Sequence, residues 1–135
     1  MPQIENASIK VAAVYTAPTG GTTTSLKSLG SNLDSHYVFL DDGAAANLQT
    51  TVSWKVNRAK PSATSPSGFT QDRVQVVLKK PKELASGAVV VNTVRFTMAV
   101  DIETSDGEVN ELMLLTAQLA GKSDFASVYS HLSVS

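Results

Sequence analysis

The sequence predicts an α+β domain in which an antiparallel β-sheet is followed by two C-terminal α-helices. Three stretches, 51–58, 72–80 and 93–103, alternate strictly between apolar and polar residues. This period of two is typical of strands with one face covered and the other in water. Helical patterns begin only after Thr104. Strands first and helices last indicate an α+β domain, not one with alternating strands and helices.

The chain length of 135 residues is that of one domain with its own core. We expect a single domain over 1–135: an N-terminal hairpin and short strand over 1–47, the main sheet strands over 48–103, and two helices over 104–135. Charged residues make up only 17% of the chain. So low a charged fraction suits a protein that buries much of its outside against copies of itself.

The N-terminal third predicts short strands. Residues 7–15, ASIKVAAVY, are expected to form a first strand, and a turn with Gly20 and Gly21 follows. A second strand is expected near 22–29. The run HYVFL over 36–40 predicts a third, which ends at the turn Asp41-Asp42-Gly43.

The central part predicts a long-looped hairpin and a long strand. The alternating stretches 51–58 and 72–80 flank a polar loop over 59–71 that contains two prolines. Small residues over 82–88 follow Pro81, and the last strand should run from about residue 89 to 103. The apolar side chains of these strands are expected to form the covered face: Val52, Trp54, Val56, Val74, Val76, Leu78, Val94, Phe96, Met98, Val100 and Ile102.

The C-terminal part predicts two helices. Ser105 and Glu108 have the spacing of a capping box, in which each side chain binds the other residue's backbone N–H. The helix should run to Ala120 and stop at Gly121, a residue that readily takes the left-handed conformation. Ser123 is expected to cap a second, shorter helix through 124–132.

Two features predict self-association. Eight of the twelve residues 109–120 are apolar, more than a helix lying on one sheet needs. The strand that ends at Glu103 is long and free of proline, so at a sheet edge it would be open to pairing. A two-fold contact with a second copy would cover both. The alternative is that other strands of the same chain cover the strand.

Catalytic and metal-binding patterns are almost absent from the sequence. His36 and His131 have no carboxylate at strand or helix spacing, and neither GxxxxGK[ST] nor GxGxxG occurs. The turn Asp41–Gly43 lacks the further oxygen ligands of a calcium loop. The chain has no cysteine, which excludes disulfides and thiolate metal sites. We therefore expect no enzyme, no cofactor, no metal and no small-molecule substrate.

Membrane and export signals are also lacking. No apolar run reaches the roughly 18 residues of a membrane span. The first 15 residues lack the basic segment and apolar core of a signal peptide. We expect no membrane partner and a protein that stays where it is made.

Charge is segregated along the chain. Residues 51–97 hold eight basic residues against two acidic ones, whereas the rest holds three against ten. The basic residues recur on the polar side of successive strands with short polar groups between them, which favours an anionic partner, with nucleic acid first. The alternative is an ordinary solvated sheet face. Trp54 falls on the apolar side, so we expect it in the core, and no exposed aromatic residue is expected among the basic ones.

These residues together resemble the coat proteins of single-stranded RNA bacteriophages, the leviviruses. The resemblance lies in TVSWKVNR, DRVQVVLKKP, a small-residue loop, TVRFTMAVDIE, and ETSDGEV opening an apolar helix, in that order. It covers about residues 48–135, and the N-terminal part only loosely.

The resemblance implies an intertwined homodimer with a continuous ten-stranded sheet, whose helices lie across the partner's sheet. Such dimers would form a T=3 icosahedral capsid with the free sheet face turned inward to single-stranded genomic RNA. That face would also bind an RNA hairpin, which represses translation and favours packaging. The loop from about Glu83 to Asn92 would meet its copies at the symmetry axes. The protein would be located in the virion and made in the cytoplasm of a bacterial host.

The strand positions that the resemblance and the basic pattern assign to RNA binding are Ser53, Lys55, Asn57, Arg73, Gln75, Lys79, Thr93, Arg95 and Thr97. Family members often place a base-stacking tyrosine where this chain has Thr93, and the loop over 59–71 is longer than usual. A rival interpretation is a dimeric RNA-binding regulator that never assembles.

Overall fold

The computed structural model describes residues 7–12, 19–122 and 125–131. They fall into two compact units. One is formed by Gly20–Glu103, and the other combines the N-terminal segment with the residues from Thr104 onward. Each unit is described by itself below.

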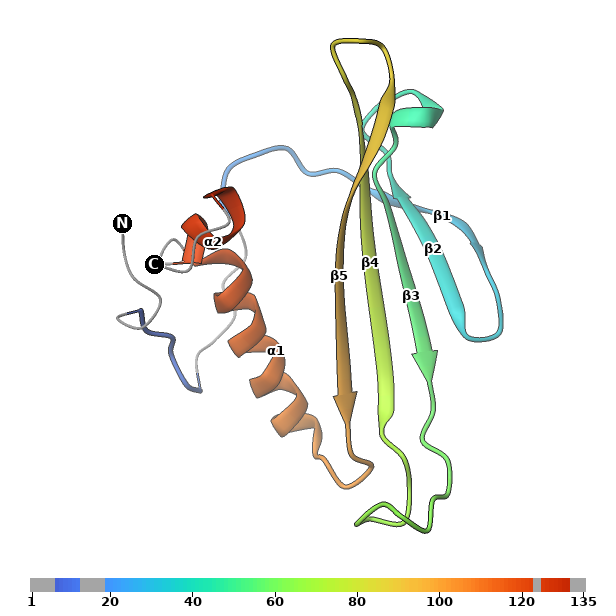
Figure 1. The fold of residues 1–135 in the computed structure, drawn as a ribbon, viewed down its shortest axis with the longest axis vertical. Helices are drawn as coiled ribbons and strands as arrows, with labels where there is room; N and C mark the ends of the chain where they lie inside the picture. The colour runs from blue at the N-terminus through green and yellow to red at the C-terminus, as the bar shows by residue number, and fades with distance from the viewer. Residues whose placement is uncertain (1–6, 13–18, 123–124, 132–135) are drawn as a thin grey trace. The chain divides into compact units, whose positions relative to one another are not determined.

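The sheet unit is a five-stranded antiparallel meander, in which each strand pairs with the next one along the chain (Figure 1). This confirms the predicted strand succession of the main sheet. The strands are β1 (Leu26–Ser31), β2 (Ser35–Leu40), β3 (Thr51–Asn57), β4 (Asp72–Glu83) and β5 (Val89–Val100), with a 3-10 turn at Ala46–Leu48 between β2 and β3.

The register separates the two faces of the sheet as the alternation predicts. Trp54 lies opposite Val76, which lies opposite Phe96, so these three side chains share one face. Lys55 lies opposite Gln75, which lies opposite Thr97, on the other face. Residues directly opposite each other in an antiparallel pair point the same way. All residues of the predicted apolar set that lie in the strands therefore share one face of the sheet.

The predicted first strand is wrong over its described part. Residues 7–12 form no strand, and Ala12 has a positive φ of 55°; residues 13–15 lie outside the described residues. The second predicted strand exists as β1, but its partner is β2. The predicted N-terminal hairpin is thus replaced by a hairpin of β1 and β2.

The hairpin of β4 and β5 differs from the prediction at both of its ends: β4 continues to Glu83, beyond the predicted Lys80, whereas β5 ends at Val100, before the predicted Glu103. Its two strands pair over twelve consecutive positions, from Asp72 opposite Val100 to Glu83 opposite Val89. The loop is therefore reduced to residues 84–88, where Gly87 takes a φ of 87°, and Asn92 belongs to β5. Pro81 is accommodated inside β4 because it lies beyond the last pair with β3, where a missing N–H is tolerated.

The second unit contains α1 (Asp106–Gly121) and the short α2 (Ala126–His131). The capping box of α1 is present as predicted, since the Glu108 N–H donates to the Ser105 side chain at 3.2 Å. Gly121 is the last residue of α1 and not a left-handed cap; the extended Lys122 ends the helix. The predicted cap of the second helix, Ser123, lies outside the described residues.

Side chains of α1 bind the backbone of the N-terminal segment 7–12. The Gln118 amide accepts from the Lys10 N–H at 2.6 Å and donates to the Lys10 carbonyl at 2.8 Å. Glu111 accepts from the Ala12 N–H at 2.9 Å. These bonds replace the strand ladder that was expected of this segment. They satisfy both backbone groups of Lys10 and the N–H of Ala12 without a β-strand partner.

The other side of α1 is apolar and exposed. Leu112, Met113 and Leu119 are 44%, 39% and 44% exposed. At 3.6 residues per turn, Leu112 and Leu119 lie about a quarter of a turn from the stripe that holds Glu111 and Gln118, and Met113 lies nearly opposite that stripe. One side of the helix therefore binds the chain's own N-terminal segment, while an apolar stripe stays open.

Few apolar side chains are buried. Among the described residues the buried hydrophobic ones are Val38, Val76 and Phe125. On β5 the apolar face is open in the single chain, with Val94 60% and Phe96 43% exposed, so the chain itself leaves the expected cover incomplete there. Over the same residues, no helix is long and apolar enough to cross a membrane.

Candidate nucleic-acid interface

All nine predicted RNA-binding residues lie on one face of the sheet, called the basic face from here on. The pairs that place them there run across β3, β4 and β5. Four rows of directly opposite residues result: Ser53 with Val77 and Arg95, Lys55 with Gln75 and Thr97, Asn57 with Arg73, and Lys79 with Thr93. The sheet thus brings together residues that are up to 44 positions apart in the sequence.

The cations of the basic face are exposed and available to a ligand. Lys55, Arg73, Lys79 and Arg95 are all exposed. In the described part of the chain Lys27 pairs with Asp41 at 2.7 Å, whereas those four cations have no acidic partner there. Of the strand residues on this face, only Glu83, at the far end of β4, is acidic. The face therefore carries uncompensated positive charge, as binding to phosphates requires.

The spacing of these cations suits an extended ligand. Neighbouring strands lie about 4.8 Å apart, so β3 and β5 are separated by roughly 10 Å across the face. Residues two apart on one strand are about 6.6 Å apart. Hydroxyl and amide groups of Ser53, Gln75 and Thr97 lie between the cations. Such groups can bind base edges while lysine and arginine bind the backbone.

The sequence prediction missed two aromatic residues on this face. Tyr37 lies opposite Ser53 and Phe39 opposite Thr51, so both share the side of Lys55. Tyr37 is 41% exposed. The expectation that no exposed aromatic residue accompanies the cations is therefore wrong. Because HYVFL is apolar or aromatic at four of its five positions, its alternation did not indicate which side chains would share the basic face.

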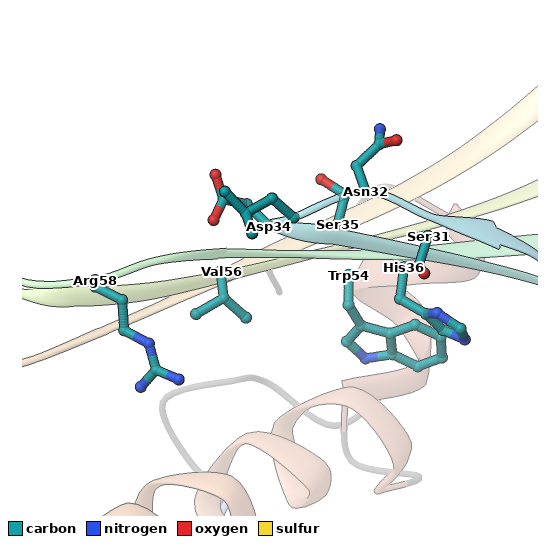
Figure 2. Close-up of a pocket in the computed structure, with 9 residues that line it drawn as sticks. Ser31, Asn32, Asp34, Ser35, His36, Trp54, Val56 and Arg58 are labelled. Carbon is teal, nitrogen blue, oxygen red and sulfur yellow. The ribbon is translucent and has the colours of Figure 1, made fainter.

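The apolar face holds a pocket of about 300 Å³ next to the turn between β1 and β2. His36 and Trp54 lie opposite each other in the register, and Figure 2 shows both projecting to the same side of the sheet as Val56 and Arg58. Trp54 thus takes the apolar side as predicted, but it lines an open pocket and is only partly buried.

Nothing in this pocket forms a catalytic pair. Asp34 is near His36 in sequence, yet Figure 2 shows its carboxylate on the opposite side of the strand. Among the described residues no group of three or more His, Asp or Glu side chains is placed to hold a metal ion. The pocket offers shape and an aromatic ring but no acid–base machinery.

The long loop between β3 and β4 is fixed by hydrogen bonds. Asp72 accepts from the Ala59 N–H at 2.6 Å, and the Ser67 hydroxyl donates to Asp101 at 2.6 Å. The Ser67 hydroxyl, together with the Glu103 backbone N–H, holds the pKa of Asp101 below its usual value because both bonds favour the ionised carboxylate. The loop is thereby tied to the residue that follows β5.

Comparisons with known proteins converge on one fold. The chain has 22% sequence identity to a virus-like particle of bacteriophage GQ-907, with a TM-score of 0.86 over 98% of this chain and 100% of the other. A virus-like particle of Beihai levi-like virus 21 has 17% identity and a TM-score of 0.60, over 93% and 97%. An unassembled bacteriophage coat-protein dimer, described as RNA-binding, has 15% identity and a TM-score of 0.51, over 92% and 93%.

No protein-family model matches the sequence, and no curated protein matches it. The structural matches nevertheless extend over almost the whole of both chains. The chain therefore has the fold of bacteriophage coat proteins. The resemblance to levivirus coat proteins that the sequence predicted is confirmed at the level of the fold, and the expectation of no enzyme agrees with these neighbours.

Proposed function

We propose that this chain is the coat protein of an RNA bacteriophage, a structural protein that dimerises, assembles into a closed shell and binds the genome on its basic face. The observation that carries the proposal is the fold it shares with a phage particle over 98% of its length. Low identity leaves the functional residues to be argued from this chain's own surface, in the steps that follow.

The first step is dimerisation through β5. In the described part of the chain, β5 pairs with β4 on one side and with no strand on the other. Joining β5 to its own copy by a two-fold contact would complete a ten-stranded sheet. It would also place two basic faces side by side, with Arg95 near the junction. A face twice as wide binds a longer stretch of RNA.

The second step is burial of apolar surface between copies. Val94 and Phe96 are exposed on the sheet, and Leu112 and Leu119 are exposed on α1. Laying α1 of one copy across the apolar face of the other would cover both sets. Burial contributes about 1.5–3 kcal/mol for each large apolar side chain, enough to hold an obligate dimer together when several take part. This is the intertwined arrangement that the resemblance to levivirus coat proteins implies.

The third step is assembly of dimers into a T=3 icosahedral shell. The tip of the β4–β5 hairpin, residues 84–88, extends beyond the pairing with β3. Such a tip is suited to meeting its copies around symmetry axes, and Gly87 with its positive φ supplies conformational freedom. We place the protein in the virion, after synthesis in the cytoplasm of a bacterial host.

The fourth step is RNA binding inside the shell. The cations Lys55, Arg73 and Arg95 would neutralise phosphates of the single-stranded genome, while Ser53, Asn57 and Gln75 would bind base edges. A hairpin operator bound on the same face would repress translation and mark the genome for packaging. The proposal requires no cofactor and no small-molecule substrate.

Sizing of the purified full-length chain, with absorbance at 260 and 280 nm, tests the proposal. A particle of megadalton mass that contains nucleic acid is the expected result. A stable species near 28 kDa, twice the chain mass of 14.2 kDa, that binds RNA without assembling would favour the dimeric regulator instead. A monomer without affinity for RNA would contradict both functions.

A further inference from the structure

Tyr37 is an aromatic residue of the basic face that the proposed contacts leave unused. The register places Tyr37 opposite Ser53, which lies opposite Val77, which lies opposite Arg95. The ring therefore belongs to the same row across the sheet as a cation of the RNA face. Its side chain is 41% exposed, so it is accessible to a ligand on that face.

Two neighbours make this position suitable for a nucleotide. Lys55 is the diagonal neighbour of Tyr37, because it pairs with Ser35 two residues along β2. Diagonal neighbours lie about 7–8 Å apart, within the reach of a long side chain. A base on the ring would thus leave its phosphate near the Lys55 ammonium and its edge near the Ser53 hydroxyl.

The Tyr37 side chain is open to a ligand at its hydroxyl end as well. Within the described residues the Tyr37 hydroxyl makes no hydrogen bond, whereas the Tyr129 hydroxyl donates to the Leu119 carbonyl at 2.6 Å. Phe39, two residues further along β2, is less exposed and sits beside Tyr37 on the same face. Phe39 can support the Tyr37 ring from one edge.

We propose that Tyr37 is a stacking platform for an unpaired base of single-stranded RNA. Unpaired bases are bound by stacking on aromatic side chains, and this contact tolerates any base because each has a π-face. The inference rests on the proposed RNA-binding function and adds to it a contact with the face of a base, beside the polar groups proposed to bind base edges. Tyr37 contributes base stacking, while Lys55 and Arg95 contribute charge.

The test uses the full-length protein before assembly, with two ligands: oligouridine, and an oligonucleotide of equal length made of abasic sites. Tyr37→Ala should bind oligouridine about 5- to 150-fold more weakly than the wild type. Its salt dependence should be unchanged, and so should its affinity for the abasic ligand. Tyr37→Phe should bind as the wild type does. His36→Ala, next along β2 and on the apolar face, is the matched control and should also bind normally.

The outcomes separate the inference from the function beneath it. If Tyr37→Ala binds oligouridine as the wild type does, the stacking role is overturned. If Lys55→Ala in the same experiment has a smaller salt slope, the RNA-binding face itself is still supported. A wild type that binds neither ligand overturns both.

A second measurement does not depend on the folding of a variant. Oligouridine carrying 5-iodouridine is photocrosslinked to the wild type, and the adduct is mapped by mass spectrometry. An adduct on Tyr37 is expected. Adducts confined to other residues would overturn the proposal.

Discussion

The two edges of the sheet differ in ways that indicate which one meets a partner. β1 has six residues, its register shifts between Ser28 and Gly30, and its Lys27 is ion-paired to Asp41. β5 has twelve residues in unbroken register with β4, and it has neither a bulge nor a proline. Bulges, charges and short strands are the devices that keep sheet edges from pairing. The β1 edge therefore carries protection that the β5 edge lacks, as expected if β5 is the edge that joins a second copy.

The largest effect on dimerisation should come from a charge placed on the apolar face of β5. Val94→Asp would bury a carboxylate between the copies, which costs on the order of several kcal/mol and weakens dimerisation about a thousandfold. We expect this variant to sediment as a 14.2 kDa monomer. Leu29→Asp on β1 is the control, because Leu29 is 55% exposed where Val94 is 60% exposed. If both variants associate as the wild type does, β5 is not the interface.

A cavity on the same face of β5 should weaken dimerisation less than the buried charge does. Phe96→Ala removes a ring that is 43% exposed in one chain but buried in the proposed dimer, which costs the dimer at most about 1.5–3 kcal/mol of lost burial. Urea unfolding followed at several protein concentrations measures it. The wild-type midpoint should rise with concentration, as dimerisation requires, and Phe96→Ala should lower it. Leu26→Ala on β1 should change little. A wild-type midpoint independent of concentration would contradict the dimer.

The basic face should show the same asymmetry between edges. Arg95 on β5 is unpaired in the described part of the chain, whereas Lys27 on β1 is held by Asp41. Arg95→Gln should therefore reduce the log–log salt slope of RNA binding by about 0.7 for each phosphate that the variant no longer neutralises. Lys27→Gln should change the slope less. Equal reductions in both variants would show that the RNA does not favour the β5 side.

The smallest effect is expected at the residue that follows β5. The lowered pKa of Asp101 means that its ionised form stabilises the fold above the usual pKa, and that this stabilisation is lost as the pH falls through the lowered value. Ser67→Ala should raise the pKa of Asp101 toward its usual value and weaken the acid dependence of unfolding. Carboxyl titration by NMR measures this, with Ser65→Ala as the control. An unchanged pKa in Ser67→Ala would mean that the hydroxyl does not stabilise the carboxylate.

The sequence predicted the parts of the fold that depend on local periodicity. Val52, Trp54 and Val56 alternate with polar residues, so their side of the sheet could be derived from the pattern alone. The same holds for the capping box of Ser105 and Glu108. Eight of the nine site residues lie inside the alternating stretches 51–58, 72–80 and 93–103. The ninth, Thr93, is the first residue of the last stretch and lies within β5. Their placement on one face followed from antiparallel pairing.

The parts that failed depend on distant partners. Residues 7–12 alternate like a strand, but Gln118 and Glu111 bind their backbone, and nothing local in the sequence indicates a partner about a hundred residues away. The side on which Tyr37 lies could be derived only from its register with Ser53, since its own strand is apolar on both sides. Position 121 showed a third limit, because glycine permits a left-handed cap without requiring one.

A single-cysteine scan tests the central claim, that two copies join through β5, most directly. The chain has no cysteine of its own, so each introduced thiol reports one position. Facing residues of antiparallel strands lie about 4.5–5.5 Å apart at Cα, a separation that a disulfide spans. Oxidation should yield a covalent 28 kDa dimer, twice 14.2 kDa, from at least one of the twelve β5 positions and from none of the six on β1. Cross-linking through β1, or none through β5, would contradict the account.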